Sequence, residues 1–89
     1  MSNQSILERM NSTCKRHRAG DLGVKGLIAT LDAHAQALEG ISTVARNGLR
    51  DLLNKLEMLD RVENYDPMSP ACQRILERLE RWIEDLSLT

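Results

Sequence analysis

The residues Lys15, Arg16, His17 and Arg18 form the one cationic run of the sequence. Such a run could contact the phosphates of a nucleic acid or the carboxylates of an acidic protein. It could equally be a solvated helix end whose charges complement the helix dipole. Nucleic-acid modules usually add a broad basic face or stacking aromatics, and this chain has neither. We therefore keep Lys15, Arg16 and Arg18 as a candidate anion contact, and nucleic-acid binding as the alternative function.

Cys14 and His17 are three residues apart, a spacing that places two metal ligands on one helix face. A structural zinc site needs four ligands, and Cys72 and His34 are the only other cysteine or histidine residues. Without a paired CxxC motif, we predict no metal site. Both cysteines are expected on apolar helix faces as small hydrophobic residues, because two of them do not make a disulfide framework.

Four carboxylates near the C-terminus could in principle supply general acid–base chemistry, but only in a pocket that perturbs their pKa values. Arginines interleave with them, as is typical of an exposed helix face. His34 could act as a pH-sensitive switch, although we expect it at the margin of the core with one ring nitrogen in water. No Ser, Cys or His forms a nucleophile constellation, so we predict no enzyme, no catalytic residue and no cofactor. The carboxylates are Glu77, Glu80, Glu84 and Asp85.

The composition indicates a single all-α domain over residues 1–89. Eighty-nine residues suffice for one modest core. Phenylalanine is absent and only one Trp and one Tyr occur, whereas β-rich cores rely on aromatic and β-branched residues. The net charge of −1 points neither to nor away from a polyanionic partner. We expect a cytoplasmic protein, because no signal peptide is visible and the apolar runs are too short for a membrane span.

The stretch from Val24 to Val62 carries a heptad pattern typical of a packed or coiled helix. One row keeps a single phase throughout, and a second row follows it four residues later. The first row is Val24, Leu31, Leu38, Ala45, Leu52 and Leu59, and the second is Ile28, Ala35, Leu49 and Leu56.

Gly40 leaves two interpretations of this stretch open. In one, Gly40 ends a helix, Ser42 caps the next, and the chain forms a compact four-helix bundle. In the other, a single kinked helix runs through. Three observations favour continuity: the heptad phase is unchanged, Ser42 has no acidic capping-box partner, and Glu39 and Arg46 would each have the wrong sign for the dipole of a broken helix. We therefore predict one long central helix, with the break at Gly40 as the alternative.

Local signals define the flanking helices. The first is predicted at about Ser5 to Arg18, ending with Gly20 in the left-handed conformation, and Asp21 is the expected N-cap of the central stretch. Asn64 to Pro67 has turn chemistry. Ser69 and Pro70 then predict the start of a last helix, Pro70 to Leu86, with Ser at the N-cap and Pro at the first helical position. Its predicted apolar face is Cys72, Ile75, Leu76, Leu79, Trp82, Ile83 and Leu86.

These elements predict a long central helix with a short helix folded back at each end. Because such a monomer would leave apolar surface uncovered, we expect a homodimer. The candidate partner or dimer interface is Leu31, Leu38, Leu49, Leu52, Leu56, Leu59 and Trp82. A lone Trp on an apolar face is usually core, but at an interface it would be the energetic hot spot.

The predicted function is that of a small non-enzymatic protein-binding module, such as an adaptor, regulator, secretion chaperone, or antitoxin or immunity-type inhibitor. It would act through helical packing surfaces on a protein partner. Small helical chains that carry no catalytic, metal-binding or nucleotide-binding motif are mostly of this class.

Overall fold

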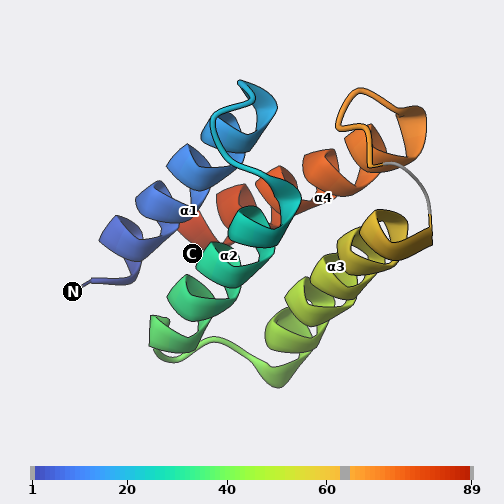
Figure 1. The fold of residues 1–89 in the computed structure, drawn as a ribbon. Coiled ribbons are helices and arrows are strands. Elements are labelled where there is room, and N and C mark those ends of the chain that lie inside the picture. Colours follow the sequence, from blue (N-terminus) through green and yellow to red (C-terminus); the bar gives the residue numbers. More distant parts are fainter. Residues whose placement is uncertain (1, 63–64, 89) are drawn as a thin grey trace.

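A computed structural model describes residues 2–62 and 65–88, which form four helices and no strand. The helices are α1 (Asn3–Arg18), α2 (Val24–Ala37), α3 (Thr43–Val62) and α4 (Pro70–Ser87) (Figure 1). The prediction of an all-helical chain is confirmed. The prediction of one long central helix is wrong, because α2 and α3 are separate helices that pack side by side.

Successive helices run antiparallel and close a four-helix bundle (Figure 1). α1 contacts α2 and α4, and α3 contacts the same two helices. Within residues 2–62 and 65–88, the diagonal pairs α1 and α3, and α2 and α4, make no close backbone contact. Each helix therefore turns its apolar stripe toward one shared interior, where Met10, Leu31, Leu56 and Leu76 are fully buried.

The break between α2 and α3 depends on three residues of the loop, Leu38, Gly40 and Ser42. Leu38 is extended, with φ −69° and ψ 135°. Gly40 has φ 71°, a left-handed conformation that costs other residues about 1–2 kcal/mol. The Ser42 hydroxyl accepts a hydrogen bond from the Ala45 amide at 3.1 Å. Ser42 is therefore the N-cap of α3 even without a capping box, as the alternative interpretation required.

Two side chains from outside this loop hold it in place. The Asn3 amide group donates to the Glu39 carbonyl at 2.6 Å and accepts from the Glu39 amide at 3.0 Å. The Arg46 guanidinium donates to the carbonyls of Ala35 and Leu38, at 3.2 and 2.7 Å. These carbonyls belong to the C-terminal end of α2, where a positive charge is favourable. Arg46 thus stabilises the end of α2 rather than the start of its own helix.

The connection from α1 to α2 is a Schellman motif, in which two amides after the helix bond back to its last turn. The Gly20 amide donates to the His17 carbonyl at 3.1 Å, and the Asp21 amide donates to the Arg16 carbonyl at 3.0 Å. Gly20 has φ 85°, so the predicted left-handed glycine is confirmed. Asp21 is not the N-cap of the following helix, since α2 begins after Gly23, which makes no side-chain cap.

The start of α4 is formed as predicted. The Ser69 amide donates to the Asp66 carbonyl at 3.0 Å, and the Ser69 hydroxyl accepts from the Cys72 amide at 3.3 Å. Pro70 occupies the first helical position. Asn64, which was part of the predicted turn, lies outside the described residues. In the part of the chain that is described, no helix combines the length and the apolar character that a bilayer crossing requires.

Candidate functional site

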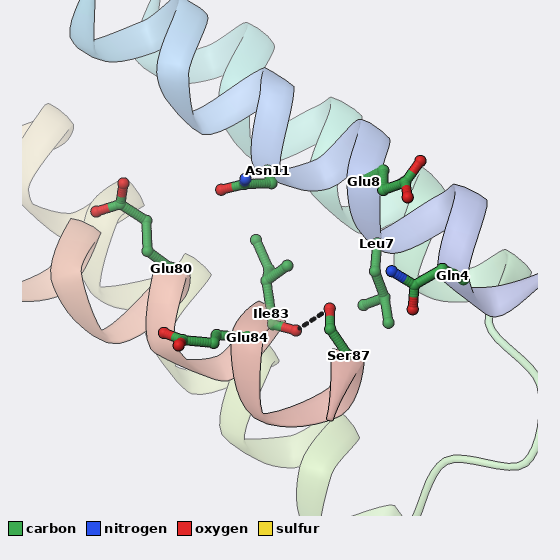
Figure 2. A pocket seen from close by; sticks show the side chains of 8 residues that line it. All are labelled: Gln4, Leu7, Glu8, Asn11, Glu80, Ile83, Glu84 and Ser87. Atoms are coloured by element: carbon green, nitrogen blue, oxygen red, sulfur yellow. Dashed lines mark hydrogen bonds between the residues drawn. The ribbon is translucent and has the colours of Figure 1, made fainter. Parts of the chain in front are cut away.

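A groove of about 330 Å³ lies between α1 and α4 (Figure 2). Its floor is formed by Leu7 and Ile83, each 3% exposed. Carboxylates and amides on its walls could accept hydrogen bonds from a basic side chain. The Ser87 hydroxyl donates to the Ile83 carbonyl at 2.9 Å, and the described residues that line the groove include no histidine. The polar walls are Gln4, Glu8 and Asn11 from α1, and Glu80, Glu84 and Ser87 from α4.

The three residues of the predicted anion contact have different surroundings: two are exposed, and Arg18 forms an ion pair within the chain whose side chains are 29% and 31% exposed. Arg18 Nη2 lies 2.6 Å from Glu80 Oε1, and Arg18 Nη1 donates to Gln73 Oε1 at 2.7 Å. The hydrogen bond to Glu80 raises the pKa of Arg18 above its ordinary value. Only Lys15 and Arg16 of the three predicted residues are exposed. Arg18 therefore joins α1 to α4, and Glu80 belongs to this contact rather than to the predicted exposed face.

His17 connects three segments of the chain instead of binding a metal with Cys14. The imidazole is 3% exposed, and its Nδ1 lies 2.8 Å from the Leu22 carbonyl. Since a carbonyl can only accept, Nδ1 carries a proton and donates to Leu22, and the Tyr65 hydroxyl lies 2.9 Å from Nε2. Burial raises the pKa of the Tyr65 phenol, and the neighbouring Cys72 thiol adds to this effect. The sequence spacing placed His17 on the same helix face as Cys14, but nothing in it pointed to Tyr65.

Both cysteines are free thiols in the interior. Cys14 is 0% exposed and Cys72 is 2% exposed, in agreement with their prediction as small core residues. Burial raises the pKa of Cys14 to about 11, with the negative charge of Glu80 adding to the shift and Arg18 opposing it. Across residues 2–62 and 65–88, no group of three or more His, Cys, Asp or Glu side chains is placed to hold a metal ion.

His34 is placed differently from Leu31 and Leu38, its neighbours in the predicted seam. It is only partly buried, but its Nδ1 atom is buried without a hydrogen-bond partner among the described residues. A shallow hollow beside it between α1 and α2 is lined by Arg9 and Arg16. An unbonded buried nitrogen costs free energy, and it does not by itself constitute a site.

Most of the predicted interface residues lie in the interior of the single chain. Leu31, Leu38, Leu49, Leu52 and Leu56 are each at most 8% exposed and belong to the core. Leu59 and Trp82 are half-buried. The five buried leucines are therefore not a surface that a partner could reach in this structure. The expectation of a homodimer depended on one long central helix, and α2 and α3 are separate helices.

Trp82 lies at the boundary between α3 and α4. Its indole packs against the core, and its Nε1 donates to the Ala45 carbonyl at 2.9 Å. A Cβ atom placed on Gly48 would have this same Nε1, at 4.0 Å, as its one contact. A glycine in a helix interior costs up to about 1 kcal/mol relative to alanine. Among the described residues, no closer contact therefore requires a glycine at position 48.

The side of α3 that faces away from the bundle keeps large apolar side chains in water. Val44 is 82% exposed, Met58 is 62% exposed and Val62 is 75% exposed. In Figure 1, α3 lies at one edge of the bundle with no helix over its outer side. We call the six exposed positions along this side the outer stripe of α3: Val44, Gly48, Asp51, Lys55, Met58 and Val62.

No known protein family, no curated protein and no solved structure matches this chain.

Proposed function

We propose that the chain is a small non-enzymatic protein-binding module that contacts its partner through the outer stripe of α3. One observation carries the proposal: α3 presents apolar side chains on two sides. Its inner side supplies Leu49, Leu53 and Leu56 to the core, whereas its outer side exposes Val44, Met58 and Val62. Folding of the bundle requires only the first of these sets. Val44 lies at one end of this outer side and Met58 and Val62 lie at the other, and large apolar side chains exposed along one side of a helix can mark a protein–protein contact.

The geometry of the stripe favours a helix as the contacting element. Its positions are spaced by four and three residues, which is the spacing at which two packed helices meet. Residues 44 and 62 are 18 positions apart, so the stripe is about 27 Å long at 1.5 Å per residue. Half-buried Leu59 and Trp82 extend its border toward α4. A partner helix laid along the stripe would cover the three exposed apolar side chains at once.

The proposal is tested by placing a photoreactive phenylalanine analogue at Met58 in cells of the protein's own source. Irradiation should produce a covalent adduct that mass spectrometry identifies. The purified partner should then bind the wild-type chain, and it should bind M58E at least tenfold more weakly, because a carboxylate would be buried at the contact. The same analogue at Arg81, on the exposed face of α4, is the matched control and should give no such adduct. If position 58 also gives none, the outer stripe is not a binding surface.

A further inference from the structure

The outer stripe of α3 is arranged symmetrically about residue 53. Val44 and Val62 lie nine positions on either side of it, Gly48 and Met58 lie five, and Asp51 and Lys55 lie two. Each pair is chemically complementary. The outermost positions are both valine, the next are the smallest and one of the longest side chains, and the innermost carry opposite charges. This symmetry is what a surface needs in order to contact a copy of itself through a two-fold axis.

We infer that a second copy of this chain binds the outer stripe, with the two α3 helices antiparallel about a two-fold axis at the level of residue 53. This inference rests on the proposed function and names its partner. In this arrangement, Val44 of one copy lies opposite Val62 of the other. Met58 of one copy enters the space left by Gly48 of the other. No close contact among the described residues requires a glycine at position 48, and in this arrangement Gly48 is the hole for a methionine knob.

The charges at the centre of the stripe select the antiparallel orientation. Asp51 Oδ2 and Lys55 Nζ are 3.1 Å apart within one chain, with side chains that are 65% and 46% exposed. In the antiparallel pair, Asp51 of each copy lies opposite Lys55 of the other, so four charges alternate in sign. A parallel pair in register would place aspartate against aspartate and lysine against lysine. Opposed like charges at an interface weaken binding strongly, so the antiparallel pair is preferred.

The contact is small, which limits its strength. One helix from each copy forms the contact. The buried area is therefore below the roughly 1,200–2,000 Å² that is typical of stable complexes. We expect a dimer with a dissociation constant in the micromolar range or weaker. Such an equilibrium lets the stripe be free at low concentration and covered at high concentration.

Sedimentation equilibrium of charge variants tests the pairing. Asp51→Lys and Lys55→Asp each place like charges opposite one another and should lower the association constant at least tenfold. The double variant Asp51→Lys, Lys55→Asp restores opposite charges and should return the constant to within a few-fold of the wild type. Both Asp51 and Lys55 are exposed, so the circular dichroism of the helices should be unchanged in all three variants. A wild-type chain that stays monomeric up to about 1 mM, well above the weak range expected for such a small contact, would overturn the inference. A double variant as weak as the singles would also overturn it.

Cysteine cross-linking tests the orientation. V44C mixed with V62C should form a disulfide between the two variants, because the antiparallel pair brings these positions together. V44C alone should not cross-link to itself, since the two copies of position 44 would be separated by about 27 Å along the helices, far beyond the reach of a disulfide. The native cysteines are buried and do not compete. Cross-linking of V44C to itself would show a parallel pair and refute the proposed axis.

The photo-cross-linking experiment separates failure of this inference from failure of the proposed function. An adduct of two copies, joined between positions 58 and 48, supports both. An adduct with a different protein that loses affinity for M58E keeps the proposed function and overturns the second copy as the occupant. The absence of any adduct at position 58 removes both.

Discussion

Replacing Gly40 with alanine should lower the free energy of unfolding, while the same replacement at Gly48 should raise it. The two substitutions add one methyl group each, so their difference reports the backbone at the two sites. Gly40 has φ 71° in the loop between α2 and α3. Gly48 lies inside α3. A continuous helix through residue 40, the architecture favoured by the heptad pattern, would make both substitutions stabilising.

The magnitudes follow from the local conformations. A left-handed residue other than glycine costs about 1–2 kcal/mol, and the smaller conformational freedom of unfolded alanine offsets about 0.4–1 kcal/mol of this. No atom lies within 4 Å of a Cβ at residue 40, so a clash adds nothing. Gly40→Ala should therefore destabilise the fold by about 0.8 kcal/mol, the midpoint of a range of about 0–1.6 kcal/mol. Gly48→Ala should stabilise it by up to about 1 kcal/mol, because its Cβ meets only Trp82 Nε1 at 4.0 Å.

Urea unfolding followed by circular dichroism measures both changes. Thermal melts should shift in opposite directions, at about 4–8 °C for each kcal/mol in a domain of this size. The comparison belongs at a low protein concentration, where self-association through α3 does not add to the stability. A stabilised Gly40→Ala variant would refute the loop, and with it the assignment of α2 and α3 as separate helices.

Three further outcomes follow from the core. Leu79 is 0% exposed, so Leu79→Ala should lower the free energy of unfolding in urea by about 2–5 kcal/mol. Arg81→Ala, on the exposed side of α4, should change it by no more than about 0.5 kcal/mol. The reverse order would show that the buried face of α4 is wrongly assigned. Tyr65→Phe removes the hydroxyl that lies 2.9 Å from His17 Nε2 and leaves this buried ring nitrogen unbonded, so it should cost about 1–3 kcal/mol. A change below experimental error would argue against that hydrogen bond. The pKa of Cys14 rises from 9.0 in the unfolded chain to about 11 in the fold, so the unfolded chain loses this proton first and stability should fall as the pH increases from about 9 to 11, by roughly 2–3 kcal/mol. Cys14→Ala should reduce this dependence when the free energy of unfolding is measured at about pH 8 and about pH 10.5, leaving the part that comes from the raised pKa of Tyr65.

Helix ends with local chemistry could be predicted from the sequence. Ser69 and Pro70 start α4 because a hydroxyl and a fixed φ act on the same few residues. Gly20 ends α1 for the same kind of reason. The apolar face of α4 was also correct, since a helix period of 3.6 residues decides which side chains share a side. In all of these cases, the residues that determine the structure lie within one turn of each other.

The contacts between distant segments could not be predicted in this way. Arg18 and Glu80 are 62 positions apart, and His17 and Tyr65 are 48 positions apart. Helical periodicity shows that a residue faces the interior, but it does not show which helix lies opposite. Polar partners on neighbouring helices depend on the packing of the bundle. The sequence accordingly placed His17 on one helix face with Cys14 and left its partners unidentified.

The unbroken heptad phase misled the prediction because a loop residue took part in the core. Leu38 follows the last residue of α2 and has an extended backbone, yet its side chain is only 1% exposed. It therefore continues the row from Leu31 to Leu52 although the helix has ended. Hydrophobic spacing reports burial, and burial does not require that the backbone between two buried residues be helical.

Arg46 shows why the dipole argument gave the wrong sign. A cation in the first turn of α3 is unfavourable if only α3 is considered. In the bundle, the end of α2 lies beside the start of α3. The Arg46 guanidinium donates hydrogen bonds to the Leu38 carbonyl at 2.7 Å and to the Ala35 carbonyl at 3.2 Å. The charge that argued for one continuous helix is thus the group that stabilises the end of the first of two. A charge at a helix end is evidence about that helix only when no second helix end lies within reach of the side chain.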